Sequence, residues 1–498
     1  MFALNITNKH EKRDRMRKFE SQVQLKKYEV LREVSKMSFE GSLDEEYNKI
    51  PEIIDKGPEA TTRCCIYKER AVTKDRVSLA MGNLNSEENV IQVIDSACDA
   101  CPIDRYVVTE ACRGCLAHRC QDVCPVGAIK IVAHRAYIDQ NKCVECGKCK
   151  QACPYNAISD VMRPCRRACP VGAISLDGNK KAVIDDSKCI QCGACVYQCP
   201  FGAIMDSSYI VDIINLLKES KKGTRVYATI APAISSQFTY ASIEQVVNGI
   251  KKLGFHDVVE AALGADFVVE HEAKEWLERI EAGDAFMTSS CCPAFVKHIE
   301  NAYPQLMSSV SHTISPMKAI ARLIKNVDKD AKVVFIGPCT AKKREWKEQK
   351  EDDVDYVMTF EELAAMLDAK GIELDKCEES PLNNASFYGR IFARSGGLEE
   401  AVNHILEEHY PDKKDSLTAM HCDGMEECEK ALKLAKFGRL KANFIEGMAC
   451  RGGCIGGAAS LSHGPKDRLE VDRYGKKALE PDVDHSLRIF NKEEINLE

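Results

Sequence analysis

Hydrophobic and polar positions follow two different patterns along the chain. Near the N-terminus, the charged stretch "HEKRDRMRKFESQVQLKKYEVLREVSKM" has apolar residues at roughly helical spacing from Phe19 to Val34, which predicts one or two helices. From Ser207 onward, helical and strand patterns alternate. "YIVDIINLLKES" predicts an amphipathic helix and "TRVYATIAP" predicts a strand. This alternation is typical of mostly parallel sheets flanked by helices.

The patterns divide the chain into three regions. We expect residues 1–95 to be mostly helical, residues 96–206 to form a cysteine-rich repeated region, and residues 207–498 to form an α/β domain. Two interpretations fit the basic side chains of the first region. They form either a face that docks an acidic partner or, more simply, a solvated helix face.

Composition narrows the class of protein. The 498 residues have a formal net charge of −7 with both signs well mixed, which argues against nucleic acid as the main partner. No run of about 18 apolar residues occurs, so we expect no membrane span. The segment "MFALNITNKHEKRDRMRKFE" lacks an apolar signal core, so we expect a cytoplasmic protein. In such a protein, 26 cysteines indicate metal binding rather than disulfides.

Sixteen of these cysteines lie in an internally repeated region, from Cys98 to Cys199, in which "CPVGAI" occurs twice and "CPYNAI" and "CPFGAI" once each. Two runs have the C-x2-C-x2-C-x3-C-P spacing that binds 4Fe-4S clusters in ferredoxins. They are Cys143, Cys146, Cys149 and Cys153, and Cys189, Cys192, Cys195 and Cys199. A variant with two extra residues consists of Cys112, Cys115, Cys120 and Cys124. Zinc is the alternative for any single C-x2-C, but the repetition favours iron–sulfur clusters.

A fourth motif is interrupted. "VMRPCRRACPVGAI" contains Cys165 and Cys169 but lacks the first two cysteines of the motif. The unassigned pair Cys98 and Cys101 supplies them if a whole ferredoxin is inserted in between. We therefore predict α+β ferredoxin-like modules, two double-cluster ferredoxins with one nested in the other. This arrangement is similar to the four-cluster electron-transfer subunits of molybdenum oxidoreductases.

Each motif of a two-cluster ferredoxin gives three cysteines to one cluster and its fourth cysteine to the other. This rule predicts four sets, which we call A, B, C and D. Set A is Cys112, Cys115, Cys120 and Cys153; set B is Cys143, Cys146, Cys149 and Cys124; set C is Cys98, Cys101, Cys165 and Cys199; set D is Cys189, Cys192, Cys195 and Cys169. Four clusters in a row form a path for electrons, so we expect the chemistry to lie in the C-terminal domain.

Three short segments of that domain carry cysteines. "DAFMTSSCCPAFVKHIE" predicts a strand, a loop and a helix with Pro293 in its first turn. "KVVFIGPCTAKKREW" predicts a strand that runs into Cys339, and "ANFIEGMACRGGCIGGAAS" predicts a strand followed by a glycine-rich turn. Each places a cysteine just past the carboxyl end of a strand, where open α/β sheets bind ligands. The glycines would allow close approach to a bulky cofactor.

The three segments resemble the three signature motifs of FeFe-hydrogenases. "TSSCCPAF" is similar to the first, "GPCTAKK" to the second and "EGMACRGGC" to the third, in family order over about residues 207–460. The resemblance implies an α/β hydrogenase domain of two lobes, each with a small parallel sheet, and a cofactor in the cleft between them. It also implies an oxidoreductase that interconverts dihydrogen with protons and electrons.

The family's active site, the H-cluster, is a 4Fe-4S cubane joined through one cysteine to a di-iron unit that carries carbonyl, cyanide and azadithiolate ligands. The cubane ligands implied here are Cys292, Cys339, Cys450 and Cys454. Cys454 would also bridge to the di-iron unit. Met448 matches a residue that packs on that unit, and Lys342 matches a lysine that hydrogen-bonds a cyanide. We expect the neighbouring Lys343 to be solvated.

The resemblance also implies a route for protons. Cys291 matches the thiol that passes protons to the azadithiolate amine. The route continues through Glu272 and Glu275, with Ser315 between them, and then through Arg279. The alternative for the three charged residues is an exposed helix, because their spacing also suits ordinary surface pairs.

Some residues depart from the family pattern or receive no role. Gly337, Arg451 and Phe295 differ from the common family residues, which indicates a divergent branch similar to the group B enzymes. The residues without an expected role are Cys64, Cys65, Cys377, Cys422, Cys428, His271, His298, His312, His421 and His463.

Three other functions fit part of the pattern. A Narf-like iron–sulfur assembly protein would lack the di-iron unit, and Cys291 and Lys342 argue against it. A sensory hydrogenase often carries an appended signalling domain, and this sequence has no pattern that predicts one. A pure electron-transfer protein would leave the C-terminal motifs unexplained. "GFHDVVEAALG" lacks the G-x-G-x-x-G fingerprint of dinucleotide sites. We therefore expect electrons to come from a ferredoxin-like carrier or a separate subunit, and hydrogenase maturation proteins to supply the di-iron unit.

Overall fold

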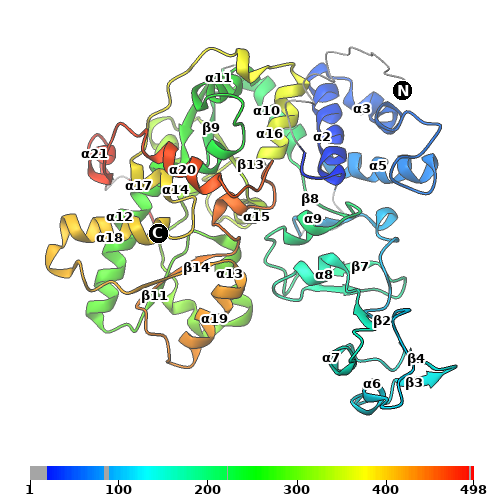
Figure 1. Ribbon diagram of the computed structural model, residues 1–498. Coiled ribbons are helices and arrows are strands. Elements are labelled where there is room, and N and C mark those ends of the chain that lie inside the picture. Colours follow the sequence, from blue (N-terminus) through cyan, green and yellow to red (C-terminus); the bar gives the residue numbers. More distant parts are fainter. Residues whose placement is uncertain (1–18, 84–88, 221–222, 493–494) are drawn as a thin grey trace.

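The computed structural model describes residues 19–83, 89–220, 223–492 and 495–498. Figure 1 shows the N-terminal helices beside the α/β domain and the ferredoxin region projecting away from both. The first part of the predicted N-terminal helical stretch, up to residue 18, lies outside the described residues.

The N-terminal region is helical. Its elements are α2 (Gln22–Glu40), α3 (Leu43–Glu46), η1 (Tyr47–Lys49), α4 (Ile50–Ile54) and α5 (Ile66–Ala80). Ser21 Oγ accepts the Gln24 N–H at 3.2 Å and caps the start of α2, and Gly41 ends the helix in the left-handed region. The predicted apolar face of α2 is buried against α5 and against two helices of the α/β domain, α10 (Ile210–Ser220) and α16 (Phe360–Ala369).

One basic side chain of α2 is not solvated, contrary to the simpler expectation, whereas Lys36 of the same helix is exposed. The Lys27 residue is only 8% exposed, and its ammonium lies among carboxylates of other regions. The expectation fails for Lys27 because α2 is covered on more than one side, and the partners that compensate Lys27 are far from it in sequence.

The cysteine-rich region contains two ferredoxin modules of the same plan, each with a pair of terminal strands and a central hairpin. The outer module has β1 (Ile91–Val93) antiparallel to β8 (Ile204–Asp206), the hairpin of β6 (Ile174–Leu176) and β7 (Ala182–Ile184), and helices α8 (Pro164–Ala168) and α9 (Ala194–Gln198). The inner module has β2 (Tyr106–Val108) antiparallel to β5 (Ile158–Asp160), the hairpin of β3 (Ile129–Val132) and β4 (Arg135–Ile138), and helices α6 (Arg119–Asp122) and α7 (Lys148–Ala152).

The inner module begins and ends at one point of the outer module. Strand β2 pairs with β5, and the Val161 N–H donates to the Arg105 carbonyl at 2.7 Å. The insertion between Cys101 and Cys165 therefore leaves and rejoins the outer module at neighbouring positions, as the nested interpretation requires. Strand β1 starts at Ile91, so the outer module begins a few residues before the expected boundary at 96.

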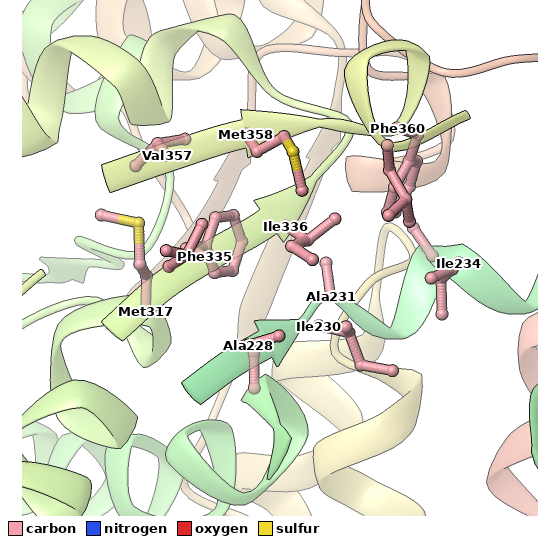
Figure 2. Packing of buried hydrophobic residues seen from close by; sticks show 14 of the residues in the cluster. Ala228, Ile230, Ala231, Ile234, Met317, Phe335, Ile336, Val357, Met358 and Phe360 are labelled. Atoms are coloured by element: carbon pink, nitrogen blue, oxygen red, sulfur yellow. The ribbon is translucent and has the colours of Figure 1, made fainter. Parts of the chain in front are cut away.

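The first lobe of the α/β domain contains a four-stranded parallel sheet of order β10-β9-β12-β13. Its strands are β9 (Val226–Ile230), β10 (Asp257–Glu260), β12 (Lys332–Gly337) and β13 (Tyr356–Thr359), and the helices that connect or cover them are α10, α11 (Ile243–Leu253), α12 (Ala261–Ala282), α14 (Pro316–Val327), α15 (Thr340–Lys347) and α16. Figure 2 shows part of its core, where Ile230, Ile336 and Met358 of three strands pack with Phe360 of α16.

The second lobe contains a three-stranded parallel sheet of order β11-β15-β14. Its strands are β11 (Met287–Thr288), β14 (Ala419–Asp423) and β15 (Phe444–Met448), and the remaining helices of the domain are α13 (Pro293–Ala302), α17 (Phe387–Ile391), α18 (Gly397–His409), α19 (Met425–Lys436), α20 (Asp467–Gly475) and α21 (Val483–Leu487). Short 3-10 turns occur at η2 (Asp95–Ala97), η3 (Pro232–Ser236), η4 (Pro304–Ser309), η5 (Leu374–Lys376), η6 (Pro411–Lys413) and η7 (Cys454–Gly456).

The prediction of ferredoxin modules followed by a domain with small parallel sheets is confirmed. Helix α12 joins the two lobes, because it follows β10 of the first sheet and precedes β11 of the second. Among the described residues, no helix combines the length and the apolar character that crossing a membrane requires.

Candidate active site and cluster-binding cysteines

The cysteines of the three C-terminal segments meet in one cavity of about 90 Å³ between the lobes. Strands β11 and β15 of the second sheet and β12 of the first all end at this cavity. The cysteines that line it are Cys291, Cys292, Cys339, Cys450 and Cys454. The parallel arrangement explains the convergence, because the carboxyl ends of parallel strands lie at the same edge of each sheet.

Four of these thiols, all partly buried, form a crowded donor set. Burial, together with the neighbouring thiol of Cys292, raises the pKa of Cys339 to about 11. Burial also raises the pKa of Cys454 to about 12, with Cys339 and Cys292 adding to it. The pKa of Cys450 lies well above its usual value for the same reasons. Thiolates this close together are stable only beside a strong positive charge, which iron ions supply, so the donor set fits a 4Fe-4S cubane.

Glycine in the third motif allows the backbone to pass close to its neighbours. Gly453 has φ of +87°, and a Cβ atom there would lie 2.6 Å from the Ser395 nitrogen. A Cβ at Gly457 would lie 2.5 Å from the Pro338 carbonyl oxygen. Gly457 therefore lies against the second motif and Gly453 against the segment of Ser395, and a side chain at either position would force the packed segments apart.

The rest of the cavity wall is apolar except for one ammonium. Ala231, Pro232, Phe335 and Met448 are among its apolar lining residues. Lys342 Nζ donates to the Cys291 carbonyl at 3.2 Å and lies 2.6 Å from Glu345 Oε2. Burial alone would lower the pKa of Lys342, but Glu345 holds it above its usual value, so the side chain is charged. An apolar cavity with one fixed ammonium beside four thiols fits an inorganic group that carries anionic ligands.

The Cys291 thiol lies beside a buried carboxyl group. Burial raises the pKa of Cys291 well above its usual value, and the ionisable neighbour that adds most to this shift is Glu272 of α12. Glu272 is 0% exposed, and burial raises its pKa to about 8, with Glu275 adding to the effect. Neither carboxyl oxygen of Glu272 has a hydrogen-bond partner of good geometry in the described part of the chain, although Ser290 and Ser311 lie nearby.

Glu275 is the next carboxylate on the route from the cavity to the surface, and several protein groups donate hydrogen bonds to it. It accepts hydrogen bonds from Ser311 Oγ at 2.6 Å and from the His312 N–H at 3.0 Å, and it pairs with Arg279 at 2.7 Å. These donors hold its pKa below the usual value despite burial. The exposed-helix interpretation is therefore wrong for Glu272, and the side chains of Glu275 and Arg279 are only 11% exposed.

Ser311, not Ser315, is the hydroxyl that the structure places by the two glutamates. The Ser315 hydroxyl is buried and has no partner among the described residues. Ser315 precedes the first turn of α14, whereas Ser311 lies in the preceding irregular segment directly over Glu275. Three further groups near Glu275 were not predicted: Thr313 Oγ1 at 3.1 Å, His312, and His271, whose Nδ1 lies 2.9 Å from Thr313 Oγ1. The sequence gives no sign of them, because the segment has no regular spacing.

Lys343 is fully buried, contrary to the expectation of a solvated side chain. Its ammonium donates to Asp206 Oδ2 at 2.8 Å, the Ser207 carbonyl at 2.7 Å and Glu362 Oε1 at 3.0 Å. The reason is the position of α15, one face of which borders the cavity while another meets the end of β8 and the start of α16.

The predicted cysteine sets of the outer module come together in the structure. The pKa of Cys165 is raised to about 11, mainly by burial, and the thiols that contribute to this shift are Cys199, Cys101 and Cys98, the other members of set C. Burial raises the pKa of Cys192 to about 12, and Cys189 and Cys169 of set D add to it.

The inner module shows the same grouping. Three thiols of set A, Cys112, Cys115 and Cys120, line one small cavity with Cys153, the fourth. In set B, the thiols of Cys143 and Cys146 raise the pKa of buried Cys149, after burial itself. Cys124 packs on the same small core as Cys143 and Cys149.

A repeated backbone contact relates the four motifs. The alanine four residues after each Cys-Pro cysteine donates its N–H to that sulfur, at 3.2 or 3.3 Å. The pairs are Ala128 with Cys124, Ala157 with Cys153, Ala173 with Cys169, and Ala203 with Cys199. In addition, Ala136 of β4 donates to Cys112 at 3.4 Å and Ala182 of β7 donates to Cys98 at 3.3 Å. Cys98 therefore occupies in the outer module the place that Cys112 occupies in the inner one.

Set D lies next to the candidate active site. The Cys192 thiol is close enough to Cys450 to raise the pKa of Cys450, and Cys339 is close enough to Cys192 to raise the pKa of Cys192. Thr340 Oγ1 at the start of α15 donates to the Gln191 carbonyl at 2.8 Å. The outer module thus meets the α/β domain through Gln191 and Cys192 as well as through the expected segment after Cys199.

The cysteines without an expected role lie apart from these sets. Cys64 and Cys65 are exposed, with their sulfurs 4.0 Å apart. Cys377 is buried near Lys252, and Cys422 and Cys428 are buried neighbours in the second lobe.

Comparison with known protein families finds four matches along the chain. Residues 224–458 match the family described as iron only hydrogenase large subunit, C-terminal domain. Residues 163–203 match a 4Fe-4S dicluster domain, and residues 136–159 and 109–127 each match a 4Fe-4S binding domain.

Curated relatives include hydrogenases and iron–sulfur assembly factors. The chain is 28% identical over 383 residues to iron hydrogenase 1 of Clostridium pasteurianum, a match that covers 67% of this chain and 66% of that protein, just under two thirds. It is 29% identical over 391 residues to the periplasmic Fe hydrogenase large subunit of Nitratidesulfovibrio vulgaris, covering 68% and 89%. It is 24% identical over 275 residues to the cytosolic Fe-S cluster assembly factor narfl of Xenopus tropicalis, covering 44% and 58%.

A solved structure of an FeFe-hydrogenase from Chlamydomonas reinhardtii aligns with a TM-score of 0.47 at 20% identity, covering 57% of this chain and 97% of that one. These matches place the hydrogenase family on the C-terminal part of the chain. Residues 224–458 belong to the iron only hydrogenase large-subunit family, and 4Fe-4S ferredoxin-type domains precede them along the chain.

Proposed function

We propose that this protein is an iron-only hydrogenase that interconverts dihydrogen with protons and two electrons. The observation that carries the proposal is the meeting of Cys291 and charged Lys342 at one apolar cavity with four partly buried thiols. Cys292, Cys339, Cys450 and Cys454 would hold the cubane of an H-cluster. When bound, its di-iron unit supplies the chemistry of dihydrogen cleavage and formation.

The protein's own part is to hold the group and to move protons. Lys342 presents a fixed ammonium to the cavity, and Met448 and Phe335 exclude water from it. Cys291 delivers or accepts a proton at its sulfur. The raised pKa of Glu272 keeps its carboxyl group protonated at neutral pH, so it can donate a proton toward Cys291.

The outer end of the proton route is ionised. Glu275 has a lowered pKa, and Ser311 Oγ stands between its carboxylate and the buried Glu272. Arg279 pairs with Glu275 and fixes it near the surface. The Arg279 guanidinium also donates to the Ser308 carbonyl at 2.8 Å. In this proposal Ser311 takes the place that the family resemblance gave to Ser315.

Sets A, B, C and D would each hold one 4Fe-4S cluster, and such clusters supply electron transfer when bound. The order of the sets supports a single path. Arg166 beside Cys165 of set C pairs at 3.2 Å with Glu145 beside Cys146 of set B, and set D borders the active site. Set A is then the end that faces outward.

A second candidate is a Narf-like iron–sulfur assembly factor, because such proteins are among the curated relatives. Under that function the cavity would need no proton-transfer thiol and no cyanide-binding ammonium. The positions of Cys291, Lys342 and Glu272 therefore favour the hydrogenase. The group B assignment, the cytoplasmic location and the role of maturation proteins belong to the same proposal.

The test is an assay of dihydrogen oxidation and evolution with viologen dyes, after the di-iron precursor has been supplied. We expect activity in at least one direction, loss of activity in Cys454→Ser, and full activity in Cys64→Ser, whose cysteine is exposed and outside every set. If fully iron-loaded wild-type protein shows no activity in either direction, the hydrogenase proposal fails.

A further inference from the structure

Two neighbouring cysteines of the N-terminal region, Cys64 and Cys65, belong to none of the cluster-binding sets. Both are exposed, and their sulfurs are 4.0 Å apart. Cys65 is the residue directly before the first turn of α5. Exposure and thiolate character decide which cysteines of a protein are oxidised, so an exposed pair at the start of a helix is a candidate for reversible oxidation.

The start of α5 gives Cys65 thiolate character. The N–H groups of a first helical turn have no partners within the helix and carry partial positive charge. The Lys68 N–H is the main cause that lowers the pKa of Cys65, and the Cys64 thiol and the Tyr67 N–H add to it. Cys65 is therefore the nucleophile of the pair, and Cys64 is the second thiol beside it.

The loop that carries the pair is anchored on both sides. Before it, the Thr61 and Thr62 hydroxyls each donate to Glu69 Oε1 at 2.8 Å, and Glu69 is buried. After it, the backbone enters α5. A change of backbone conformation at Cys64 and Cys65 is therefore passed on to the neighbouring side chains, because the loop has little freedom to absorb it.

The cations on either side of the pair contact both ends of set C. Arg63 donates to the carbonyl of Phe201 at 2.6 Å, just after the last cysteine of the set. Lys68 pairs at 2.8 Å with Asp99, which lies between the first two cysteines of the set. The Arg63 side chain is only 8% exposed and lies 3.8 Å from Asp99 as well. The two thiols are thus connected, through one cation on each side, to the segments that form set C.

We propose that Cys64 and Cys65 form a reversible thiol–disulfide site whose oxidation loosens the contact between the start of α5 and set C. The Cys65 thiolate attacks one sulfur of a disulfide R–S–S–R, which forms a mixed disulfide and releases R–S⁻. Cys64 then gives up its proton, and its sulfur attacks the Cys65 sulfur. This step forms the Cys64–Cys65 bond and releases the second R–S⁻. The two cysteines are oxidised, and the incoming disulfide is reduced to two thiols.

Closure of this bond requires the backbone to change. Neighbouring Cα atoms are about 3.8 Å apart, whereas the Cα atoms of a disulfide are usually about 4.4–6.8 Å apart. Arg63 and Lys68 flank the changed peptide, so their contacts with Phe201 and Asp99 are disturbed. A disulfide that is both strained and exposed is readily reduced, which makes the change reversible.

A thiophilic metal ion is the competing ligand for two neighbouring thiols. Zinc sites in proteins usually have three or four protein ligands. Among the residues that the structure describes, Cys64 and Cys65 belong to no group of three or more potential metal ligands. The geometry therefore favours oxidation of the pair over metal binding.

Peptide mass spectrometry tests the oxidation directly. The full chain with reconstituted clusters is incubated without oxygen with glutathione disulfide or, separately, with an oxidised thioredoxin-type protein, and free thiols are then blocked with iodoacetamide. Trypsin cleaves after Arg63 and Lys68, so both cysteines lie in the peptide CCIYK. We expect this peptide to carry an internal disulfide with at least one reagent. Reaction with only one of them identifies the source of the oxidising disulfide as a small molecule or a protein.

Single variants separate the roles of the two thiols. Cys64→Ser should accumulate the mixed disulfide on Cys65, because the second thiol is missing. Cys65→Ser should react about tenfold or more slowly, because its remaining thiol has no helix start to stabilise the thiolate. In the reduced state both variants should keep wild-type viologen-coupled activity, since neither thiol belongs to a cluster-binding set.

Hydrogen exchange tests the link to set C. Oxidation of wild type should speed amide exchange in residues 95–101 and 199–203 by about threefold or more, and leave the hairpin of β3 and β4 unchanged. Lys68→Gln should speed exchange in residues 95–101 without any oxidant. The matched control, Cys64→Ser/Cys65→Ser, should exchange like reduced wild type with and without the disulfide reagent.

The inference is overturned if neither reagent produces the internal disulfide, or if oxidised wild type exchanges like the reduced protein around set C. It is also overturned if reduced wild type binds one more zinc ion than Cys64→Ser/Cys65→Ser, which would make the pair a metal site. Peptide masses and exchange rates require no turnover of dihydrogen, so these outcomes are independent of the hydrogenase proposal.

Discussion

Lys27 Nζ lies 2.5 Å from Asp206 Oδ1, and this contact ties the first N-terminal helix to the last strand of the ferredoxin region. Lys27 also lies 2.5 Å from Glu361 of α16, and Lys343 pairs with the other oxygen of Asp206. All these groups are buried. One ionic cluster thus joins the N-terminal helices, the outer ferredoxin and the hydrogenase domain, close to the point where set D meets the active site.

Replacement of Lys27 by Met should destabilise this junction strongly. Removing one partner of a buried ion pair typically costs about 3–5 kcal/mol, because the remaining carboxylates stay buried without compensation. We expect a clear fall in the urea midpoint of unfolding. The control Lys430→Met removes a lysine whose side chain is 63% exposed in its pair with Glu426, and should cost less than about 1 kcal/mol. Equal, small effects of both substitutions would contradict a role for Lys27 in holding the regions together.

The sequence predicted the features that depend on local pattern. Cysteines after strand ends, the proline at the start of α13 and the ferredoxin motifs are all signalled by neighbours in the chain. Lys343 was expected in solvent, but it is buried among partners from distant segments, and the same holds for Lys27, which received no role from the sequence. Ser311 was missed because spacing cannot rank serines within an irregular segment.

The substitution Cys291→Ser should leave iron content unchanged but slow turnover. A positioned proton donor typically contributes about 100- to 10,000-fold, and a serine hydroxyl is a far weaker acid than a thiol. Viologen-coupled rates and iron analysis of the same sample provide the measurement. Wild-type turnover in this variant would show that protons do not pass through Cys291.

Stability should depend on pH through Glu272. In the folded protein its pKa is raised to about 8, whereas its ordinary value is 4.5, so the folded state keeps a proton that the unfolded chain loses between these values. The free energy of unfolding should therefore fall as pH rises from about 4.5 to 8, by at most about 1.36 kcal/mol per pH unit, and level off above that range.

The variant Glu272→Gln should remove this fall, since its amide does not titrate, and it should also slow turnover by about 100-fold or more. Glu278→Gln on the same helix is the control, because the Glu278 side chain is 68% exposed. Denaturation curves over this pH range make the comparison. The same pH slope in wild type and Glu272→Gln would rule out Glu272 as the titrating group.

Iron content tests the nested arrangement. On the proposed cofactors, mature protein should hold about 22 iron atoms per chain. The double variant Cys98→Ala/Cys101→Ala should lose about four of them, because set C loses two of its thiols, while the spectra of the inner module stay intact. A variant that keeps every ferredoxin cluster would contradict the assignment of Cys98 and Cys101 to set C.

The central claim is that the cavity of Cys291, Lys342 and the four-thiol set activates dihydrogen. The most direct test is isotope exchange between D2 gas and water, followed by mass spectrometry on matured protein without any electron carrier. The account predicts formation of HD and H2, and strong suppression of that exchange in Cys291→Ser. Matured, fully iron-loaded wild-type protein that forms no HD would contradict it.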